Sequence, residues 1–533
     1  MNCKYIFTTG GVISGIGKGV ASASLGLLMK LRGLKVQIVK FDPYLNINAG
    51  ILAPREHGEC FLCDDGTETD LDLGHYSRIA GIDPSNLNIY TSGTLYKEII
   101  EEQESGKWLG STIQIIPQVT DKIQERLLEI GKDSDLVIAE IGGTVGDLES
   151  GHFYEAVRQF KYKYSSNIMI CMVAPILWVE TIKEFKTKPL QSAVKELQKY
   201  GLCPDLLLCR TDRKAPDKLL QKISDLTSVP KDNIFEAPDV SSVYEVPIEF
   251  YNRHIDDLIN DYFRLKRTHC MIFKYKELVE KIQLNDKSIT IGVLGKYQNA
   301  SEAYISLKEA LHHAGAYSNV KVNIKWINSE SLESENLDLS DLNGAIVPGG
   351  FDSRGVEGKI KAIKYFREKK IPFLGICLGL QCAVIEFSRN VLGLEDANSM
   401  EFNKIAKNPV VHFVKGQEDL KKKSATMRLG AYDCELIKDS ISYSLYNKKI
   451  ISERHRHRYE VNNNYIDAFE KNGFIVVGKN PATSLIEIME LDKKIHPFFI
   501  GIQAHPEFKS RLLEPAPLFC GLVEAAIIQS NIK

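Results

Sequence analysis

The stretch Thr8-Thr9-Gly10-Gly11-Val12-Ile13-Ser14-Gly15-Ile16-Gly17-Lys18-Gly19 decides the fold of the first half of the chain. The apolar run before it, residues 5–7, predicts a buried strand, and the Ala-, Ser- and Leu-rich run at 20–31 predicts a helix. A strand, a glycine-rich turn and a helix N-terminus form a phosphate-binding loop, because backbone N–H groups and the helix dipole converge on one anion. We therefore predict a nucleotide site here, with Lys18 reaching the terminal phosphates.

The loop departs from the usual phosphate-loop pattern in two ways. Gly11 lies six residues before Gly17, one more than the pattern allows, and Gly19 occupies the place of the Ser or Thr that holds Mg²⁺. A glycine-rich hairpin without a ligand is the alternative for this segment alone. If a nucleotide binds, carboxylates elsewhere must hold the metal, since Mg²⁺ prefers one or two carboxylates plus phosphate oxygens and water. We predict Asp72 and Glu140, although a salt bridge at Glu140 and a solvated acidic loop at 64–74 are the simpler alternatives.

Composition narrows the class of protein. The chain has 533 residues, 44% of them hydrophobic, and a net charge of −2, which favours folded domains and argues against a sequence-wide nucleic-acid surface. No uncharged apolar run reaches the ~18 residues of a membrane span. Eleven cysteines without a repeating frame and without a secretory signal indicate reduced thiols in a cytoplasmic protein.

The order of apolar runs predicts two α/β domains joined by a helix. Continuous rather than alternating apolarity over short runs indicates strands buried on both faces, hence a mostly parallel sheet. The expected strands of the first domain, residues 1–265, are 5–8, 36–41, 136–140, 168–173 and 206–210. Residues 266–288 are charged with helical spacing and predict a linker helix, and a strand at 289–294 opens the second domain, residues 289–533.

Lysines near a second helix start suggest a further anion site. Lys183, Lys186 and Lys188 precede Pro189, which opens a predicted helix. Lysines at a helix N-terminus suit a second polyphosphate, although a solvated cationic face explains them about as well. The segment 147–149, after a glycine-rich stretch, could contact a sugar or a base, but its pattern is weak.

The second domain carries the most specific chemistry. Gly375-Ile376-Cys377-Leu378-Gly379 follows an apolar run and opens a helix, which is the nucleophile-elbow arrangement with cysteine in place of serine. In the stretch 498–507 an apolar strand delivers His505, and Glu507 follows two residues on, so Cys377, His505 and Glu507 are the predicted catalytic triad. The backbone N–H groups of the glycine pair at 349–350, together with that of Leu378, could form an oxyanion hole. This pattern predicts acyl transfer through a thioester.

The arginine-rich run Glu453-Arg454-His455-Arg456-His457-Arg458-Tyr459-Glu460 looks at first like a nucleic-acid patch. Its arginines are flanked by glutamates and the whole chain is not basic. We therefore interpret it as a substrate-binding or interdomain loop.

Taken together, these motifs resemble the CTP synthase family over nearly the whole chain and in the right order. In the first half the matching stretches are 10–19, Phe-Asp-Pro-Tyr-Leu-Asn (41–46), Asp-Leu-Asp-Leu-Gly (70–74), Glu-Ile-Gly-Gly-Thr-Val-Gly-Asp (140–147) and Lys-Thr-Lys-Pro-Leu-Gln (186–191). In the second half they are Pro-Gly-Gly-Phe (348–351), Gly-Ile-Cys-Leu-Gly-Leu-Gln (375–381), Glu-Arg-His-Arg-His-Arg-Tyr-Glu-Val-Asn (453–462) and His-Pro-Glu (505–507).

The resemblance implies ATP-dependent amination of UTP to CTP in a phosphate-loop domain. It implies that a C-terminal class I glutamine amidotransferase domain hydrolyses glutamine and passes the ammonia internally to the first domain. It further implies Mg²⁺, activation by GTP, feedback inhibition by CTP, and a homotetramer that in some members forms filaments.

Individual contacts carry over onto matching positions. For ATP the resemblance implies Gly15, Ile16, Gly17, Lys18, Gly19, Val20, Asp72 and Val240, with Asp72 and Glu140 as Mg²⁺ ligands. For UTP and CTP it implies Ser14, Lys40, Asp147, Leu148, Glu149, Lys186, Thr187, Lys188, Pro189, Leu190, Gln191 and Lys222. For glutamine it implies Gly350, Leu378, Gly379, Leu380, Gln381, Glu401 and Arg458.

Two departures and two rival readings remain. Gln118 stands where the family usually has His, and Asp352 stands where Gly is more usual, which puts the strength of GTP activation in doubt. A related amidoligase, such as a cobyrinic acid amide synthase, usually lacks the full cysteine triad site. A phosphate-loop switch protein with a degenerate second domain would show no glutaminase activity.

Overall fold

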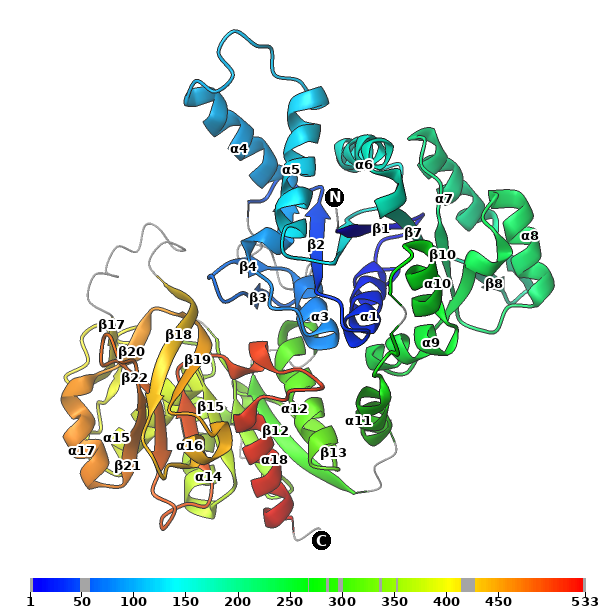
Figure 1. Ribbon diagram of the computed structural model, residues 1–533. Helices are drawn as coiled ribbons and strands as arrows, with labels where there is room; N and C mark the ends of the chain where they lie inside the picture. Colours follow the sequence, from blue (N-terminus) through cyan, green and yellow to red (C-terminus); the bar gives the residue numbers. More distant parts are fainter. Residues whose placement is uncertain are drawn as a thin grey trace. The chain divides into compact units, whose positions relative to one another are not determined.

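The computed structural model describes residues 3–47, 58–266, 268–283, 287–295, 301–334, 338–350, 353–413 and 427–530. The chain divides into two compact units (Figure 1). The first consists of Met1–Ile51 and Thr69–Lys276, and the second of Leu52–Glu68 and Glu277–Lys533. A short piece of the N-terminal half therefore belongs to the second unit.

A parallel sheet forms the centre of the first unit. Within the described residues it has seven strands in the order β11-β10-β7-β1-β6-β2-β5, and every neighbouring pair is parallel. Their bounds are β1 Lys4–Gly10, β2 Val36–Asp42, β5 Ile89–Thr91, β6 Leu136–Ile141, β7 Ile168–Pro175, β10 Leu206–Thr211 and β11 Ile234–Pro238. The central strands are buried along their length, so the continuous apolar runs did indicate a sheet covered on both faces.

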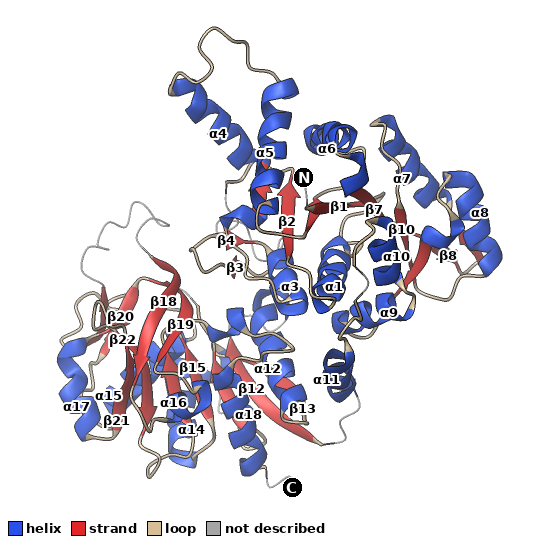
Figure 2. Cartoon of the chain, viewed as in Figure 1, coloured by secondary structure: helices blue, strands red, loops and turns tan. Residues whose placement is uncertain are grey.

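Helices cover both faces of this sheet (Figure 2). One face packs against α4 (Ser92–Glu104), α5 (Thr120–Gly131), α6 (Gly151–Lys163), α7 (Lys188–Lys199) and α8 (Asp217–Thr227). On the other lie α1 (Lys18–Leu31), α3 (Leu71–Ala80), α9 (Val246–Asn252) and α10 (Ile255–Tyr262), which contact one another around α1. Two short strands, β8 (Leu177–Val179) and β9 (Glu184–Lys186), form a hairpin ahead of α7.

The second unit is built on a mixed sheet. Its described strands run in the order β13-β12-β14-β15-β23-β22-β21-β18-β19, parallel as far as β23 and antiparallel beyond it. Their bounds are β12 Ser288–Gly295, β13 Lys321–Asn328, β14 Gly344–Val347, β15 Phe373–Ile376, β18 Arg428–Leu436, β19 Ile450–His457, β21 Phe474–Lys479, β22 Ile486–Leu491 and β23 Phe499–Ile502. The predicted α/β class is thus confirmed for both halves.

Two apolar cores flank the second sheet. One includes α14 (Val356–Lys369), α15 (Leu378–Asn390) and α17 (Ile466–Lys471), and the other includes α12 (Ile305–Tyr317) and α18 (Pro517–Gln529), with α16 (Ile441–Tyr446) beside it. The remaining short elements are α13 (Ser331–Ser334), the strands β16 (Asn398–Ser399), β17 (Pro409–Phe413) and β20 (Tyr459–Val461), and the hairpin strands β3 (Phe61–Leu62) and β4 (Glu68–Thr69). Helix α11 (Phe273–Gln283) occupies the middle of the stretch for which the sequence predicts a linker helix.

One structural prediction is wrong. The run 453–460 is not a loop, because residues 453–457 lie in β19 and residues 459–460 lie in β20, with Arg458 between the two strands. Alternation of charged residues with histidines at a period of two is the pattern of a strand whose two faces meet different partners.

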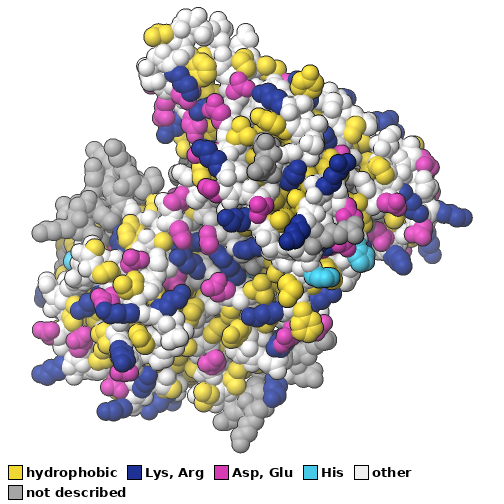
Figure 3. All heavy atoms as spheres, in the orientation of Figure 1, with side chains coloured by type: hydrophobic (Ala, Val, Ile, Leu, Met, Phe, Trp, Pro, Cys, Tyr) yellow, Lys and Arg dark blue, Asp and Glu magenta, His cyan; other side chains and the backbone are white. Residues whose placement is uncertain are grey.

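The surface carries charges of both signs. Figure 3 shows basic and acidic side chains interspersed on the visible faces. None of the described helices combines the length and apolar character needed to cross a bilayer.

Candidate functional site

The phosphate-binding loop runs from the end of β1 to the start of α1. Gly15 and Gly17 have φ values of 70° and 91°, a backbone conformation that glycine adopts without strain. A Cβ at Gly11 would lie 2.0 Å from the Cβ of Ala193 on α7, and a Cβ at Gly19 would lie 2.5 Å from an Asp72 carboxylate oxygen. The loop is therefore pressed between the helix after the 184–187 segment and the acidic start of α3, where larger residues would not fit.

Buried charges gather beside this loop. Lys40 at the end of β2 lies 2.6 Å from the Asp70 carboxylate and also pairs with Asp72. Burial alone would lower the pKa of the Lys40 ammonium, but the surrounding carboxylates raise it well above its ordinary value. Lys18 donates a hydrogen bond to the Gly143 carbonyl, beyond the end of β6. The structure thus brings Lys18, Lys40 and Asp72 to one edge of the sheet, at the carboxyl ends of the strands.

The negatively charged forms of Glu140 and Asp42 are disfavoured in this cluster. Burial, with the nearby Asp72 charge, raises the pKa of Glu140 to about 8, and burial raises the pKa of Asp42 to about 7. Tyr76 donates a hydrogen bond to Glu140. A bound divalent cation would remove this penalty, because it supplies the positive charge that the buried carboxylates lack. Within the described residues, no three His, Cys, Asp or Glu side chains form a candidate metal site. Asp72 and Glu140 remain the predicted Mg²⁺ ligands, a pair that phosphate and water oxygens would complete.

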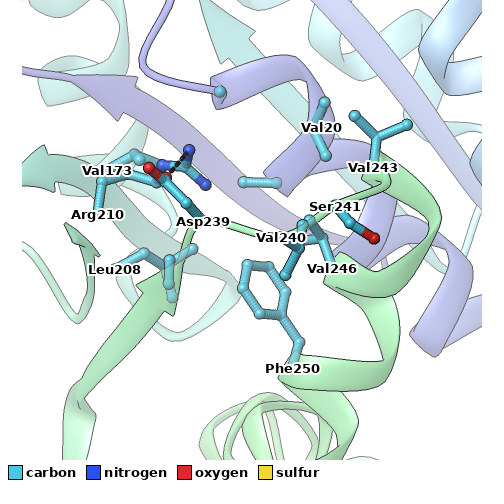
Figure 4. Close-up of a pocket in the computed structure, with 13 residues that line it drawn as sticks. Val20, Val173, Leu208, Arg210, Asp239, Val240, Ser241, Val243, Val246 and Phe250 are labelled. Carbon is cyan, nitrogen blue, oxygen red and sulfur yellow. Dashed lines mark hydrogen bonds and ion pairs between the residues drawn. The ribbon is translucent and has the colours of Figure 1, made fainter. Parts of the chain in front are cut away.

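A pocket of about 420 Å³ opens next to the loop (Figure 4). Its walls include the predicted ATP residues Gly17, Val20 and Val240, together with Phe250 of α9. Arg210 from the end of β10 is paired with Asp239 at 2.5 Å and also lines it. Its size and mainly apolar lining suit a purine base. No sequence motif predicts Phe250, because nothing local marks a phenylalanine in an amphipathic helix as a pocket residue.

The lysine segment and its neighbours lie around β9 and the start of α7. Lys186 pairs with Glu184 at 2.6 Å, and this lysine, with a smaller effect from Lys222 on α8, lowers the pKa of the Glu184 carboxyl. Thr187 accepts a hydrogen bond from Gln191 at 2.9 Å and is buried. Because Ala193 of the same helix contacts the loop at Gly11, this segment and the phosphate loop are neighbours.

The other predicted nucleotide contacts are either exposed to solvent or hydrogen-bonded to other residues of the chain. Ser14 is exposed on the loop, and Leu148 and Glu149 are exposed beyond β6. The Asp147 carboxylate accepts hydrogen bonds from the backbone N–H and the hydroxyl of Thr144, at 2.7 and 2.8 Å, so it closes its own turn. Lys40 lies with the acidic cluster rather than with the lysines near Glu184. Gln118 accepts a hydrogen bond from the backbone N–H of Gln114.

The nucleophile elbow is built by close packing. Cys377 has φ 52° and ψ −102°, a strained conformation for a residue with a side chain, directly before α15. A Cβ at Gly375 would lie 2.7 Å from the backbone of Gly379, and a Cβ at Gly379 would lie 2.1 Å from the Val347 carbonyl oxygen. Both glycines are thus required for the tight turn that presents Cys377 at the end of β15.

His505 and Glu507 lie beside the elbow because β23 pairs with β15. The Nδ1 atom of His505 is 2.8 Å from a Glu507 carboxylate oxygen, and both residues are buried. Burial alone would lower the pKa of His505, but the electrostatic effects of Glu507 and Cys377, with hydrogen bonds to both, raise it to about 10. The site therefore favours the protonated form of the His505 imidazole. A Cβ at Gly349 would lie 2.5 Å from the His505 ring, so the glycine pair after β14 makes room for it.

Gln503 is a neighbour of Cys377 that the motif search missed. Its side-chain amide donates toward the Cys377 sulfur at 3.7 Å, and its carbonyl oxygen lies 3.4 Å from the amide of Gln381. Gln381 also donates to the Tyr459 carbonyl at 3.0 Å. Gln503 directly follows β23 (Phe499–Ile502), and its place at the end of a buried strand, two residues before His505, is the signal that could have found it.

The predicted glutamine contacts lie on α15, at Gly350 and around Tyr459, whose carbonyl accepts a hydrogen bond from Gln381. Gly350 lies within van der Waals reach of Leu378. Arg458 and Glu401 both act electrostatically on Tyr459, and the Arg458 Nε is buried without a hydrogen-bond partner among the described residues. Phe351 and Asp352, the latter bearing on GTP activation, lie outside the described residues.

Comparisons with known proteins find CTP synthase relatives for both halves of the chain. The family model for the CTP synthase N-terminus matches residues 4–265, and that for class-I glutamine amidotransferase matches residues 299–525. CTP synthase of Nostoc punctiforme is 45% identical over 532 residues, covering 99% of this chain and 97% of that protein. CTP synthase of Methanococcus maripaludis is 46% identical over 533 residues, covering 98% and 99%. A solved Trypanosoma brucei CTPS glutaminase domain with bound acivicin is 38% identical and covers 45% of this chain and 94% of that one, with a TM-score of 0.42. The chain belongs to the CTP synthase family and is a glutamine-dependent ligase.

Proposed function

We propose that the protein aminates UTP to CTP with ATP, using ammonia that it releases from glutamine at Cys377, His505 and Glu507. The observation that carries the proposal is the elbow itself. Cys377 is held in a strained turn at a helix N-terminus, beside an imidazole that a buried carboxylate keeps protonated. The same chain holds a phosphate-binding loop beside buried carboxylates and a base-sized pocket.

In the glutamine reaction, the Cys377 thiolate attacks the side-chain amide carbon of glutamine. The negative charge that develops on the carbonyl oxygen is stabilised by the backbone N–H groups of Leu378 and Gly350. His505 gives its proton to the departing nitrogen, so that ammonia leaves and a thioester to Cys377 remains. Water then adds to the thioester, with His505 accepting its proton, and glutamate is released. Glu507 keeps the imidazole oriented throughout.

In the synthetase reaction, ATP occupies the loop and the pocket of Val240 and Phe250. When bound, Mg²⁺ on Asp72 and Glu140 would neutralise charge on the ATP phosphates. Lys18 and Lys40 stabilise charge on the transferring phosphoryl group. The γ-phosphoryl group goes to the uracil O4, and ammonia then replaces the phosphate at C4 to give CTP, ADP and phosphate. Making ammonia inside the protein and passing it internally keeps it unprotonated.

The contacts and controls that the family resemblance implies complete the proposal. UTP is bound by the 186–191 segment with Lys222, and CTP inhibits with contacts from 147–149. GTP activates glutamine hydrolysis, and the protein works in the cytoplasm as a homotetramer that can form filaments. The close approach of Ala193, on the helix that follows the lysine segment, to the phosphate loop at Gly11 supports placing UTP beside ATP.

The test is CTP formation from UTP, ATP, Mg²⁺ and glutamine, followed by the change in pyrimidine absorbance. Cys377→Ala should abolish the glutamine-dependent rate and keep the rate with ammonium chloride, while Cys382→Ala, one turn along α15, should keep both. If no CTP forms with either nitrogen donor, the pyrimidine assignment fails and another amidoligase substrate must be sought. If glutamine is not hydrolysed at all, the triad assignment fails.

A further inference from the structure

The hairpin of residues 58–68, here called the triad hairpin, belongs to the second unit although it lies within the N-terminal half of the sequence. Its turn is closed by the Cys63 N–H donating to the Thr67 carbonyl at 2.9 Å. The Ala431 N–H of β18 donates to the Asp64 carbonyl at 2.8 Å, and a Cβ at Gly430 would lie 2.6 Å from that oxygen. The tip of the triad hairpin is therefore seated closely on β18.

Charged pairs fasten the triad hairpin to β19. The Arg454 Nε lies 2.5 Å from an Asp64 carboxylate oxygen, and the Arg456 Nε lies 2.7 Å from Glu68. These arginines share one face of the strand. The opposite face carries the histidines, with His455 Nδ1 2.9 Å from His457 Nε2. Two of the three alternating arginines, Arg454 and Arg456, are thus explained by partners in the triad hairpin.

Arg454 also holds the backbone on both sides of the predicted catalytic histidine. Its carbonyl accepts a hydrogen bond from the His505 N–H at 2.8 Å, and its Nη1 donates to the Phe508 carbonyl at 3.0 Å. The guanidinium is fully buried and lies 5.2 Å from the centre of the Phe61 ring. Among the described residues, Asp64 is its one carboxylate partner.

Aromatic contacts reach the imidazole ring by a second route. Phe61 packs edge-on against Phe508 with ring centres 5.5 Å apart, and Phe508 stacks on His505 at 5.4 Å. The triad hairpin therefore supports His505 through its backbone and through its ring.

We propose that Asp64 and Arg454 are positioning residues for glutamine hydrolysis, which fix His505 against Glu507 and Cys377; this rests on the proposed function of the triad. A buried guanidinium that loses its carboxylate must find other acceptors or leave the interior. Either movement would release the Phe508 carbonyl and shift His505. Displacements of about 1 Å at a reacting group cost on the order of 100-fold in rate.

The experiment compares Asp64→Asn with Asp65→Asn in the full-length protein. Asp64→Asn removes the charge that holds Arg454. Asp65 is the matched control, because its side-chain oxygen accepts a hydrogen bond from the Thr67 N–H, which asparagine can keep. For Asp64→Asn we expect kcat for glutamine hydrolysis to fall about tenfold or more, with the KM for glutamine nearly unchanged. The rate of CTP formation from ammonium chloride should be unchanged, and Asp65→Asn should match the unsubstituted protein in both assays.

A displaced histidine also predicts an altered pH profile for glutamine hydrolysis, which a general loss of stability would not produce. A parallel fall of the glutamine and ammonia rates, or an unchanged glutaminase, would overturn the proposal. If Asp64→Asn does not fold, Phe61→Leu removes the ring on which the Arg454 guanidinium and Phe508 both pack, and it tests whether a loosened Arg454 lowers the glutaminase rate in the same way. Absence of CTP formation in the unsubstituted protein would refute the pyrimidine assignment alone, because glutamine hydrolysis is measured separately.

Discussion

Adding one methyl group at Gly379 tests the geometry of the turn that carries Cys377. The new Cβ would lie 2.1 Å from the Val347 carbonyl oxygen, whereas carbon–oxygen contacts of this kind normally lie at about 3.3–3.6 Å. The first turn of α15 must therefore move away from β14 by roughly 1 Å, taking the Cys377 backbone and the neighbouring N–H groups with it. The variant is Gly379→Ala.

The expected loss follows from that displacement. A shift of about 1 Å in the nucleophile and the oxyanion donors should lower kcat/KM for glutamine about 100-fold. Overpacking of this kind also costs about 1–3 kcal/mol of unfolding free energy, less than a folded domain usually has available. We therefore expect a folded protein whose glutaminase activity is strongly reduced.

The assay measures initial rates of CTP formation with glutamine or with ammonium chloride, in the same preparation. The ammonia-dependent rate should be retained, since ammonia bypasses the elbow. Cys382→Ala on the same helix serves as the control for small changes of volume in α15. A folded Gly379→Ala protein with an undiminished glutamine-dependent rate would refute the argument from close packing.

Three further predictions address the triad, the metal and the loop. Burial lowers the pKa of His505 and Glu507 raises it, for a net value of about 10; the imidazolium therefore stabilises the fold fully below about pH 6.5, and this contribution is lost as the pH rises toward 10. Glu507→Gln should lower the His505 pKa by about 1 to 3, read by NMR titration, and an unchanged value would contradict the pairing. Glu140→Gln should abolish CTP formation from either nitrogen donor while glutamine hydrolysis continues, and substantial synthesis from ammonia would exclude it as a metal ligand. Gly11→Ala places a Cβ 2.0 Å from that of Ala193, so ATP-dependent synthesis should fall about tenfold or more while glutaminase activity is retained. An unchanged KM and kcat for ATP would show that the loop can accommodate the extra methyl group.

Residues at the ends of buried strands were predictable from the sequence. Cys377 and His505 each follow a short apolar run, and parallel strands present their carboxyl ends at one edge of a sheet. The pairing of β15 with β23 then brings the two residues together. The same argument located Lys40 and Glu140 at one edge of the first sheet, where β2 pairs with β6.

The partners of the acidic run at 64–74 were not predictable. The run divides in the structure, because Asp64 pairs with Arg454 while Asp72 lies against the phosphate loop. Asp64 and Arg454 are separated by 390 positions, and no local periodicity records a contact at that distance. The lining of the pocket beside Val240 was not predictable for the same reason. Phe250 and Arg210 come together only when separate elements pack against one another.

The two-sided character of β19 has a consequence for insertions and deletions. Loss of a single residue just ahead of Arg454 would invert the strand, sending arginines toward the buried histidine cluster and histidines toward Asp64 and Glu68. Every charge on the strand would then face the wrong neighbour at once, whereas removal of two residues would restore the order of the faces. Length changes next to this strand should therefore be tolerated in even numbers and rejected in odd ones.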